Sequence, residues 1–295
     1  MALALVPFLL AWLRMVKKQA LLFALAFGLS MAFGCGPEPG GGGGGHVGGS
    51  GGSAGSGNGG SGGGGGTAMV AAVYAHSDST LYKVDPDSLA VTSVGLFQWP
   101  SNSTDQMTDI AIDRDGNMIG ISFMSVYAVD KSTAACRLLS MLDRSFNGLS
   151  FVPGQGPDPS APEVLLAAAL DGSVYRLDPM TGRSTPLGNF GGGLSSSGDL
   201  VSVTGFGTVA TVKQSQPGND FLARIDPATG TATVIGDTGF ADVWGLGYWK
   251  GKIYGFTDGT QFVLIDPTTG AGSLVLSSSV AWWGAGVTTS APVVP

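Results

Sequence analysis

The side chains that could carry acid–base chemistry in this chain are almost all aspartates. Histidine occurs twice, as His46 and His76, and glutamate occurs twice, as Glu38 and Glu163. A Ser-His-Asp triad or a zinc site of several histidines therefore cannot be assembled. Because His76 directly follows a strand pattern, we expect it to be a solvated loop residue rather than a catalytic base.

Five polar residues fall where a repeat of short strands would turn toward a common axis: Asp105, Asp109, Asn147, Asp199 and Asp242. Two carboxyl groups facing each other there could act as the acid and the base or nucleophile of a glycoside hydrolase. Asp109 and Asp199 occupy matching positions in their repeats, where two other repeats carry glycine. The alternative, which we favour over catalysis or a calcium site, is that both accept hydrogen bonds from neighbouring strand amides.

One segment is similar to part of a calcium loop, Asp113-Arg114-Asp115-Gly116-Asn117. Its glycine comes too early and the distal bidentate acid is missing, so we interpret it as a hairpin turn. We expect no cofactor, and the aspartates leave open only a calcium ion in the channel.

Aromatic residues gather in the same loops: Trp99, Phe190, Phe240, Trp244, Trp282 and Trp283. Several rings around one opening would form a concave apolar platform for sugar faces or for a partner's side chain. Packing between repeats is the alternative, and we favour it for Trp244 and Trp283, which each precede a glycine. Trp99 and Trp282 are expected to be freer to meet a ligand.

A repeated strand and turn predicts the elements that hold these residues. Five times a short apolar segment ends in an aspartate, at Asp85, Asp130, Asp178, Asp226 and Asp266. The spacings of 45, 48, 48 and 40 residues match one four-stranded propeller blade. Three of these turns read Asp-Pro-x-Thr-Gly, in which aspartate bonds the turn amides and glycine takes the left-handed position. We therefore assign these aspartates a structural role.

The two ends of the repeat region predict how the ring closes. Its first blade opens at 70–75 with a second strand, and the missing innermost strand is supplied by 283–287. Four continuous blades and one composite blade make five, with no unpaired inner edge. The sequence therefore predicts an all-β, five-bladed β-propeller over 68–290, followed by a tail at 291–295.

These repeats resemble the Leu-Tyr-x-Ile-Asp-Pro-x-Thr-Gly propeller repeats of secreted bacterial proteins, which are similar in pattern to the quinoprotein-like and NHL-like propellers. The resemblance covers Val70 to Val287. It implies the fold and leaves the function open, because such propellers host binding modules, hydrolases and oxidoreductases alike.

Residues 1–34 have the layout of an export signal. Two lysines at 17–18 precede an apolar run from Ala20 to Phe33, and a small residue stands before Cys35. The sequence Ala-Phe-Gly-Cys at 32–35 resembles the bacterial lipobox, which implies that Cys35 is lipidated. A complete signal begins at Met15, the expected start of translation. An uncleaved membrane anchor is the alternative, but the run is shorter than the roughly 20 apolar residues of a span.

Residues 35–67 form a glycine- and serine-rich tether behind the cysteine, with a random-coil reach of roughly 30 Å. Removal of the signal leaves 11 basic and 21 acidic residues, a formal charge of −10. Nucleic acid is therefore not expected as a partner. Cys136 would be the only thiol left, so no intramolecular disulfide is expected.

Together these features indicate an exported, monomeric protein that is lipid-anchored to the outer membrane or cell surface. A glycine-rich tether behind a lipidated cysteine is similar to surface lipoproteins of myxobacteria. Our leading interpretation is a non-catalytic binding or scaffold module for a glycan or a protein. The alternative is a carbohydrate-active or lactone-type hydrolase that uses the axial aspartates. Two carboxylates about 5 to 9.5 Å apart in an open pocket would favour the hydrolase, and a plugged channel would favour the module.

Overall fold

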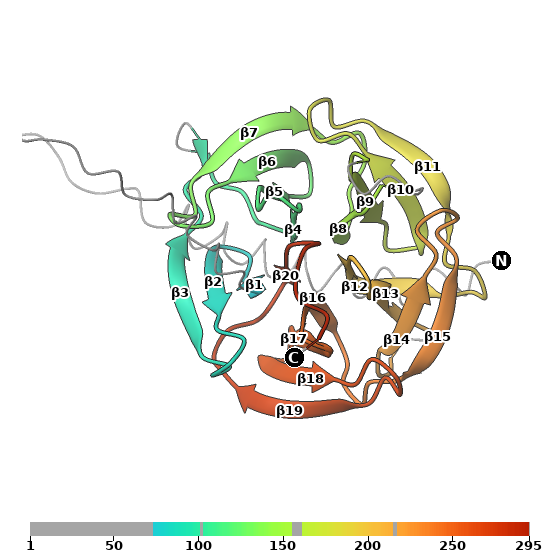
Figure 1. Cartoon of the computed structure of the whole chain (residues 1–295). Helices are drawn as coiled ribbons and strands as arrows, with labels where there is room; N and C mark the ends of the chain where they lie inside the picture. Colours follow the sequence, from blue (N-terminus) through green and yellow to red (C-terminus); the bar gives the residue numbers. More distant parts are fainter. Residues whose placement is uncertain (1–72, 101–102, 155–160, 215–216, 295) are drawn as a thin grey trace, which may run out of the picture. The chain divides into compact units, whose positions relative to one another are not determined.

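The computed structural model describes residues 73–100, 103–154, 161–214 and 217–294, and these ranges contain twenty strands and no helix. The strands form five four-stranded antiparallel sheets around a central axis (Figure 1). The predicted five-bladed β-propeller is thus confirmed. The signal and the tether that we expect at 1–34 and 35–67 lie outside the described residues.

Four blades are continuous in sequence, and the strands of each follow one another from the axis outward. The second blade is β4 (Asp109–Ile112), β5 (Met118–Ile121), β6 (Ser125–Val129) and β7 (Cys136–Met141). The third is β8 (Gly148–Val152), β9 (Val164–Ala168), β10 (Ser173–Leu177) and β11 (Ser184–Asn189). The fourth is β12 (Ser195–Val203), β13 (Gly207–Lys213), β14 (Phe221–Ile225) and β15 (Ala232–Asp237). The fifth is β16 (Val243–Trp249), β17 (Lys252–Thr257), β18 (Gln261–Ile265) and β19 (Gly272–Ser277). In all four, the first strand in sequence lies innermost.

The first blade is composite and closes the ring. Its strands from the axis outward are β20 (Gly284–Gly286), β1 (Val73–His76), β2 (Thr80–Val84) and β3 (Val91–Leu96). β20 pairs antiparallel with β1, so that Ala285 lies opposite Ala75. The ring is therefore closed by hydrogen bonds between the two ends of the repeat region, as the strand pattern predicts.

The aspartate-led turns have the local chemistry that their sequence predicts. In one of them, the Thr181 hydroxyl and the Met180 N–H donate to the carboxylate of Asp178, which holds the pKa of that carboxyl below its usual range. The turn ends at Gly182 with φ +70°. The two divergent repeats place Leu89 and Ala134 at the same position with φ +60° and +59°, so the turn imposes this conformation even without glycine.

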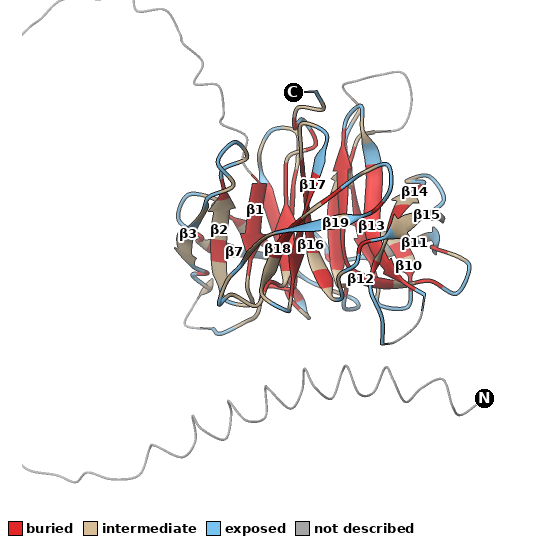
Figure 2. Cartoon of the chain, turned by 90° about the horizontal axis from the view of Figure 1, so that it is seen from below, coloured by how far each residue is buried: buried red, intermediate tan, exposed pale blue. Residues whose placement is uncertain are grey.

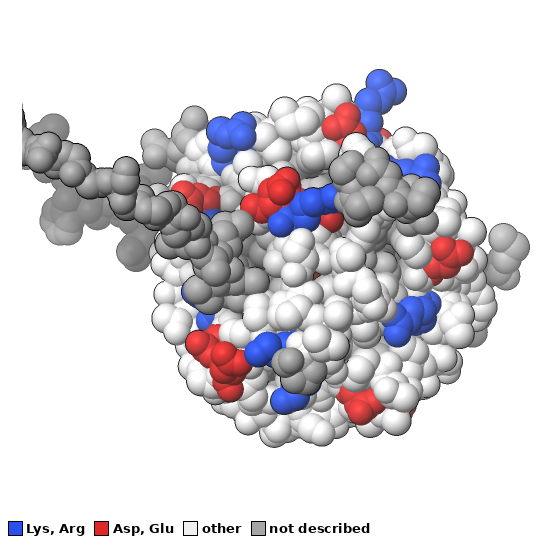
Figure 3. Space-filling model, in the orientation of Figure 1, with Lys and Arg blue, Asp and Glu red and all other residues white. Residues whose placement is uncertain are grey.

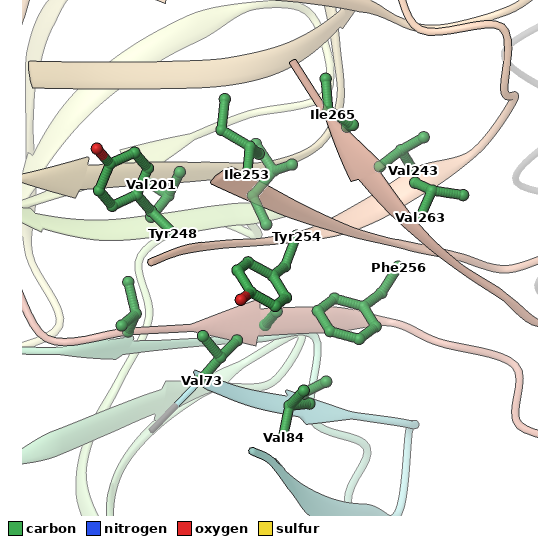
Figure 4. Packing of buried hydrophobic residues seen from close by; sticks show 14 of the residues in the cluster. Val73, Val84, Val201, Val243, Tyr248, Ile253, Tyr254, Phe256, Val263 and Ile265 are labelled. Carbon is green, nitrogen blue, oxygen red and sulfur yellow. The ribbon is translucent and has the colours of Figure 1, made fainter. Parts of the chain in front are cut away.

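The core lies between the blades, where the inner strands are buried and the outer strands are partly exposed (Figure 2). The largest apolar cluster joins the fifth blade to the composite blade (Figure 4). Phe256 stacks on Phe262 at 4.8 Å between ring centroids and contacts Trp282 at 5.3 Å. No disulfide links the described part of the chain, whose one cysteine, Cys136, is buried and unpaired.

The propeller has two faces, which we name by what lies on them. The aromatic face is formed by the loops that lead into the innermost strands, such as 238–242, and by the loops between second and third strands. The C-terminal face is crossed by residues 288–294, where Thr204 N donates to Thr289 O at 2.8 Å and Lys250 N to Pro292 O at 2.8 Å. Figure 3 shows the C-terminal face, on which acidic and basic side chains are few and interspersed. Within the described ranges, no helix is long and apolar enough to cross a membrane.

Candidate functional site

The two axial aspartates bind backbone amides of their own and of neighbouring blades. Asp109 accepts hydrogen bonds from Ile110 N at 2.8 Å and from Leu149 N, in the next blade, at 2.6 Å. Asp199 does the same with Leu200 N at 2.6 Å and with Leu246 N, again one blade on, at 2.6 Å. Both side chains are fully buried. These are the strand contacts that the structural interpretation of the two residues predicts.

Asp109 and Asp199 also interact with each other. Burial raises the pKa of both carboxyls, and the charge of Asp199 together with the hydrogen bond between the two raises the pKa of Asp109 further. Asp199 is held as the acceptor by the N–H groups of Leu246, Leu200 and Ala285.

Glycines let the inner strands approach so closely that these carboxyls lie in no open pocket. A Cβ added to Gly148 would lie 2.5 Å from Gly198 O, and one added to Gly198 would lie 2.4 Å from the Cα of Trp244. A Cβ on Gly245 would lie 2.7 Å from the carbonyl carbon of Gly284. Neither Asp109 nor Asp199 is reached by solvent. At the level of the two carboxyls, neighbouring inner strands are therefore in close backbone contact.

His76 is not the solvated loop residue that we expected from the sequence. It is the last residue of β1 and is fully buried, because Trp283 N donates to its carbonyl oxygen at 2.8 Å and Phe97 packs edge-on at 6.0 Å. Nδ1 lies 2.8 Å from Ser77 O, whereas Nε2 has no hydrogen-bond partner and lies 3.9 Å from Asp109 Oδ1. Burial lowers the pKa of His76 to about 4, so the ring is neutral at neutral pH and forms no ion pair.

Asp105 and Asn147 have other contacts. Asp105 is half-buried and accepts a hydrogen bond from the Tyr127 hydroxyl at 2.7 Å. Burial raises the pKa of Tyr127 to about 12. The backbone N of Asn147 donates to Ala168 O at 3.0 Å, and its side-chain Oδ1 is buried without a hydrogen-bond partner. Of the five polar candidates, only Asp109 and Asp199 are brought together.

Asp242 belongs to a charged cluster that sequence reasoning missed. Its Oδ1 lies 2.9 Å from Lys213 Nζ, which also lies 2.8 Å from Asp220 Oδ1. Asp220 is fully buried and accepts hydrogen bonds from Ser197 Oγ at 2.5 Å and Val243 N at 2.6 Å. Burial alone would lower the pKa of Lys213, but the two carboxylates outweigh it and raise that pKa above its usual range. The only sign of this cluster in the sequence is the lysine, Lys213, at the end of the otherwise uncharged strand β13.

Two of the six candidate aromatics are buried in the core. Trp282 is 1 % exposed and contacts Tyr82 at 5.0 Å and Phe256 at 5.3 Å, so the expectation that it is free to meet a ligand is wrong. Phe190 is also 1 % exposed and packs between the third and fourth blades. These two rings stabilise the contacts between blades and are closed to a ligand.

Two further candidates are half-buried at the periphery. Trp99 packs on Phe97 at 5.5 Å and on Tyr127 at 5.1 Å between ring centroids. Phe240 packs on the edge of the largest apolar cluster, close to Gly272, where an added Cβ would lie 2.8 Å from its ring. Trp99 is therefore less free than we expected.

The remaining two candidates, Trp244 and Trp283, lie beside the axis and are partly exposed. Their ring centroids are 6.4 Å apart in edge-to-face contact, and Phe123 contacts Trp283 in the same way at 6.3 Å. Phe123 lies in the loop between β5 and β6, which sequence analysis did not assign to this opening. We call Phe123, Trp244 and Trp283 the aromatic triad.

The turn that is similar to a calcium loop is a hairpin turn. Asp113 Oδ1 accepts hydrogen bonds from Asn117 N at 2.7 Å and from Asp115 N at 3.0 Å, and Asp113 O accepts one from Gly116 N. Among the described residues, no group of three or more His, Cys, Asp or Glu side chains could hold a metal ion.

The fold and this site define a five-bladed β-propeller with two buried axial carboxyls and a partly exposed aromatic triad at one end. No family model and no curated protein matches the chain. Among solved structures, a protein of unknown function from Bacteroides caccae is 8% identical, with a TM-score of 0.40 over 70% of this chain and 72% of its own. A chain of a nidogen/laminin complex is 8% identical, with a TM-score of 0.48 over 76% of this chain and 99% of its own. These likenesses say nothing of what this chain binds.

Proposed function

We propose that this protein is a surface-anchored lipoprotein whose propeller is a non-catalytic binding module for a glycan or a protein. The observation that carries the proposal is the aromatic triad, three partly exposed rings in edge contact at one end of the axis. Exposed aromatic rings combine a large apolar area with few rotatable bonds, which is why they recur in binding surfaces.

The geometry of the axial carboxyls argues against the hydrolase. A glycoside hydrolase needs two carboxyl groups that reach the substrate and, in inverting enzymes, a water between them. Asp109 and Asp199 are fully buried, bond to each other and accept backbone hydrogen bonds across the blades. A substrate would have to separate the inner strands to reach them, so these residues are suited to holding the ring together.

The anchor is tested by Cys35→Ala in the full chain expressed with its signal. We expect the variant to leave the membrane fraction and to appear in the soluble exported fraction, because stable attachment would depend on acyl chains. Retention of the variant in membranes would show that an uncleaved apolar segment anchors the chain instead.

The binding surface is tested with the immobilised full chain, screened against purified cell-wall and surface polysaccharides and against purified surface proteins. A ligand of the aromatic face should be retained by the native protein and lost by Trp244→Ala combined with Trp283→Ala. Leu274→Ala, which trims a 53% exposed apolar side chain on the outer strand β19, is the matched control and should retain the ligand. A ligand that the double variant still retains would place the binding surface elsewhere and overturn the proposal.

A further inference from the structure

Irregular backbone gathers on one side of the aromatic face. Asp242 has a left-handed conformation with φ +55°, and β16 is interrupted by a bulge between Val243 and Gly245, so that Trp244 is the bulged residue. β12 has its own irregularity beside it, and its Gly198 approaches Trp244 closely. Bulges re-aim side chains, and strained backbone persists where the surrounding structure holds it, commonly at binding sites.

The carboxylate of Asp242 is held in place by a buried cation. The Lys213 side chain is 5% exposed and that of Asp242 is 48% exposed, with Nζ and Oδ1 2.9 Å apart. Lys213 is itself fixed by Asp220, which Ser197 and Val243 orient. The ammonium group is therefore not a mobile surface charge. It presents Asp242 to solvent as an oriented hydrogen-bond acceptor, two residues from Trp244.

We infer that Asp242, Trp244 and Trp283 form a subsite for a neutral saccharide, an inference that rests on the proposed function and names its ligand class. A sugar ring has an apolar C–H face that packs on an aromatic ring and hydroxyl groups that donate to a carboxylate. The two indoles meet edge to face, so they offer separate ring surfaces rather than one broad flat patch.

The charge of the site selects among possible ligands. Asp242 faces solvent as an acceptor, and the whole chain carries a formal net charge of −7, so an anionic glycan would be repelled. The centre of a protein interface is depleted of aspartate, because a carboxylate buried there loses its hydration. A ligand rich in neutral hydroxyl donors satisfies Asp242 without that loss, which favours a saccharide over a protein.

The test is a titration of the purified full chain, monitored by tryptophan fluorescence. The ligands are the methyl glycosides and linear oligomers of glucose, galactose, mannose and N-acetylglucosamine. At least one neutral series should quench Trp244 and Trp283 with affinity that rises with chain length. Asp242→Asn should weaken that binding at least tenfold, since asparagine tolerates the left-handed backbone but donates where a carboxylate only accepts. Trp244→Ala should abolish it.

Asp171→Asn is the matched control, because Asp171 is an exposed carboxylate in another loop of the same face, where it accepts a hydrogen bond from Ser173 N. It should bind as the native protein does. Thermal unfolding of Asp242→Asn within a few degrees of the native midpoint would show that the variant is folded.

Two results would overturn the subsite. Saccharide binding that Asp242→Asn leaves unchanged would remove Asp242 from the site, and a chain that binds none of the neutral series would exclude the ligand class. In either case the proposed function would still stand if a protein or another glycan were retained through Trp244 and Trp283. It would fall if the double alanine variant lost no ligand.

Discussion

The two ends of the propeller axis are closed by different means. At the C-terminal face, residues 288–294 cross the ring and bond to several blades, with Thr288 Oγ1 donating to Asp113 O at 2.7 Å and Thr289 Oγ1 donating to Glu163. At the aromatic face, the side chains of Phe123, Trp244 and Trp283 meet edge to face and remain partly exposed. One end satisfies polar groups within the protein, whereas the other leaves apolar surface that a ligand could cover.

A cluster of buried polar residues lies beneath the aromatic triad. His76 accepts the backbone hydrogen bond of Trp283 and lies 3.9 Å from Asp109, which is hydrogen-bonded to Asp199. The aromatic triad is therefore supported by a buried polar layer and not by loops alone. Rigid support of this kind is what positions side chains for binding. Variants can therefore test whether the stability of the propeller and the exposure of the aromatic side chains depend on different residues.

Deleting 282–295 should have the largest effect, because it removes both β20 and the segment across the C-terminal face. β1 would lose its inner partner and the ring would stay open with an exposed strand edge. We expect aggregation or failure to fold, measured by solubility and by circular dichroism on heating. A soluble truncation that unfolds cooperatively would show that β20 is not needed for closure.

The adjacent residues Trp282 and Trp283 offer the sharpest comparison of buried and exposed rings. Trp282→Ala should lower the free energy of unfolding by roughly 3 to 5 kcal/mol, because it empties a buried site between Tyr82 and Phe256. Trp283→Ala should cost only about 1 kcal/mol, since it removes edge contacts at a partly exposed ring. Denaturant unfolding of both variants measures the difference, and equal losses would contradict the division into two kinds of ring.

The repeats predicted the fold because each aspartate-led turn is a local structure, specified by a few adjacent residues. The same turn forms at Leu89 and Ala134, where the glycine is missing, which shows that strand pairing on both sides also imposes it. Ring closure could be predicted as well, because counting strands leaves one blade without an inner strand. The turns and the ring closure could be predicted because they depend on the order of residues and strands along the chain.

The site was harder to predict because it depends on contacts between distant segments. His76 follows a strand and looks solvated in the sequence, but Trp283 from the other end of the chain covers it. Trp282 and Trp283 are adjacent, and the sequence could not show which of them points inward. Lys213 and Asp242 are 29 residues apart, and no motif links them.

His76 should make the stability of the ring depend on pH. Its pKa is about 4 in the folded protein and about 6.5 in the unfolded chain, because burial disfavours the charged ring. The stabilisation that comes with a neutral His76 is fully present above pH 6.5. It is lost as the pH falls toward 4, because the unfolded chain binds the proton more tightly than the folded protein does. The loss should approach about 3 kcal/mol near pH 4.

The measurement is the difference in unfolding free energy between the native protein and His76→Phe across pH 4 to 7. The other ionisable groups are the same in both proteins, so the difference isolates most of the contribution of the histidine. The native protein should lose stability relative to the variant as the pH falls. A difference that stays constant with pH would show that His76 is solvated or already charged when folded.

The smallest effect is expected at the C-terminal face, from Thr289→Val. The substitution keeps the shape of the side chain and removes the hydroxyl that donates to Glu163, whose carboxylate is 7% exposed and also lies 3.7 Å from Arg114 Nε. Because Arg114 still contacts that carboxylate, the loss should be about 1 kcal/mol in the free energy of unfolding, the worth of one hydrogen bond. Ligand retention at the aromatic face should stay unchanged, since Thr289 contacts Glu163 on the opposite face of the propeller. A Thr289→Val variant with native stability but weakened ligand binding would show that the C-terminal segment acts on the aromatic triad, and the contrast between a stabilising end and a binding end would then fail.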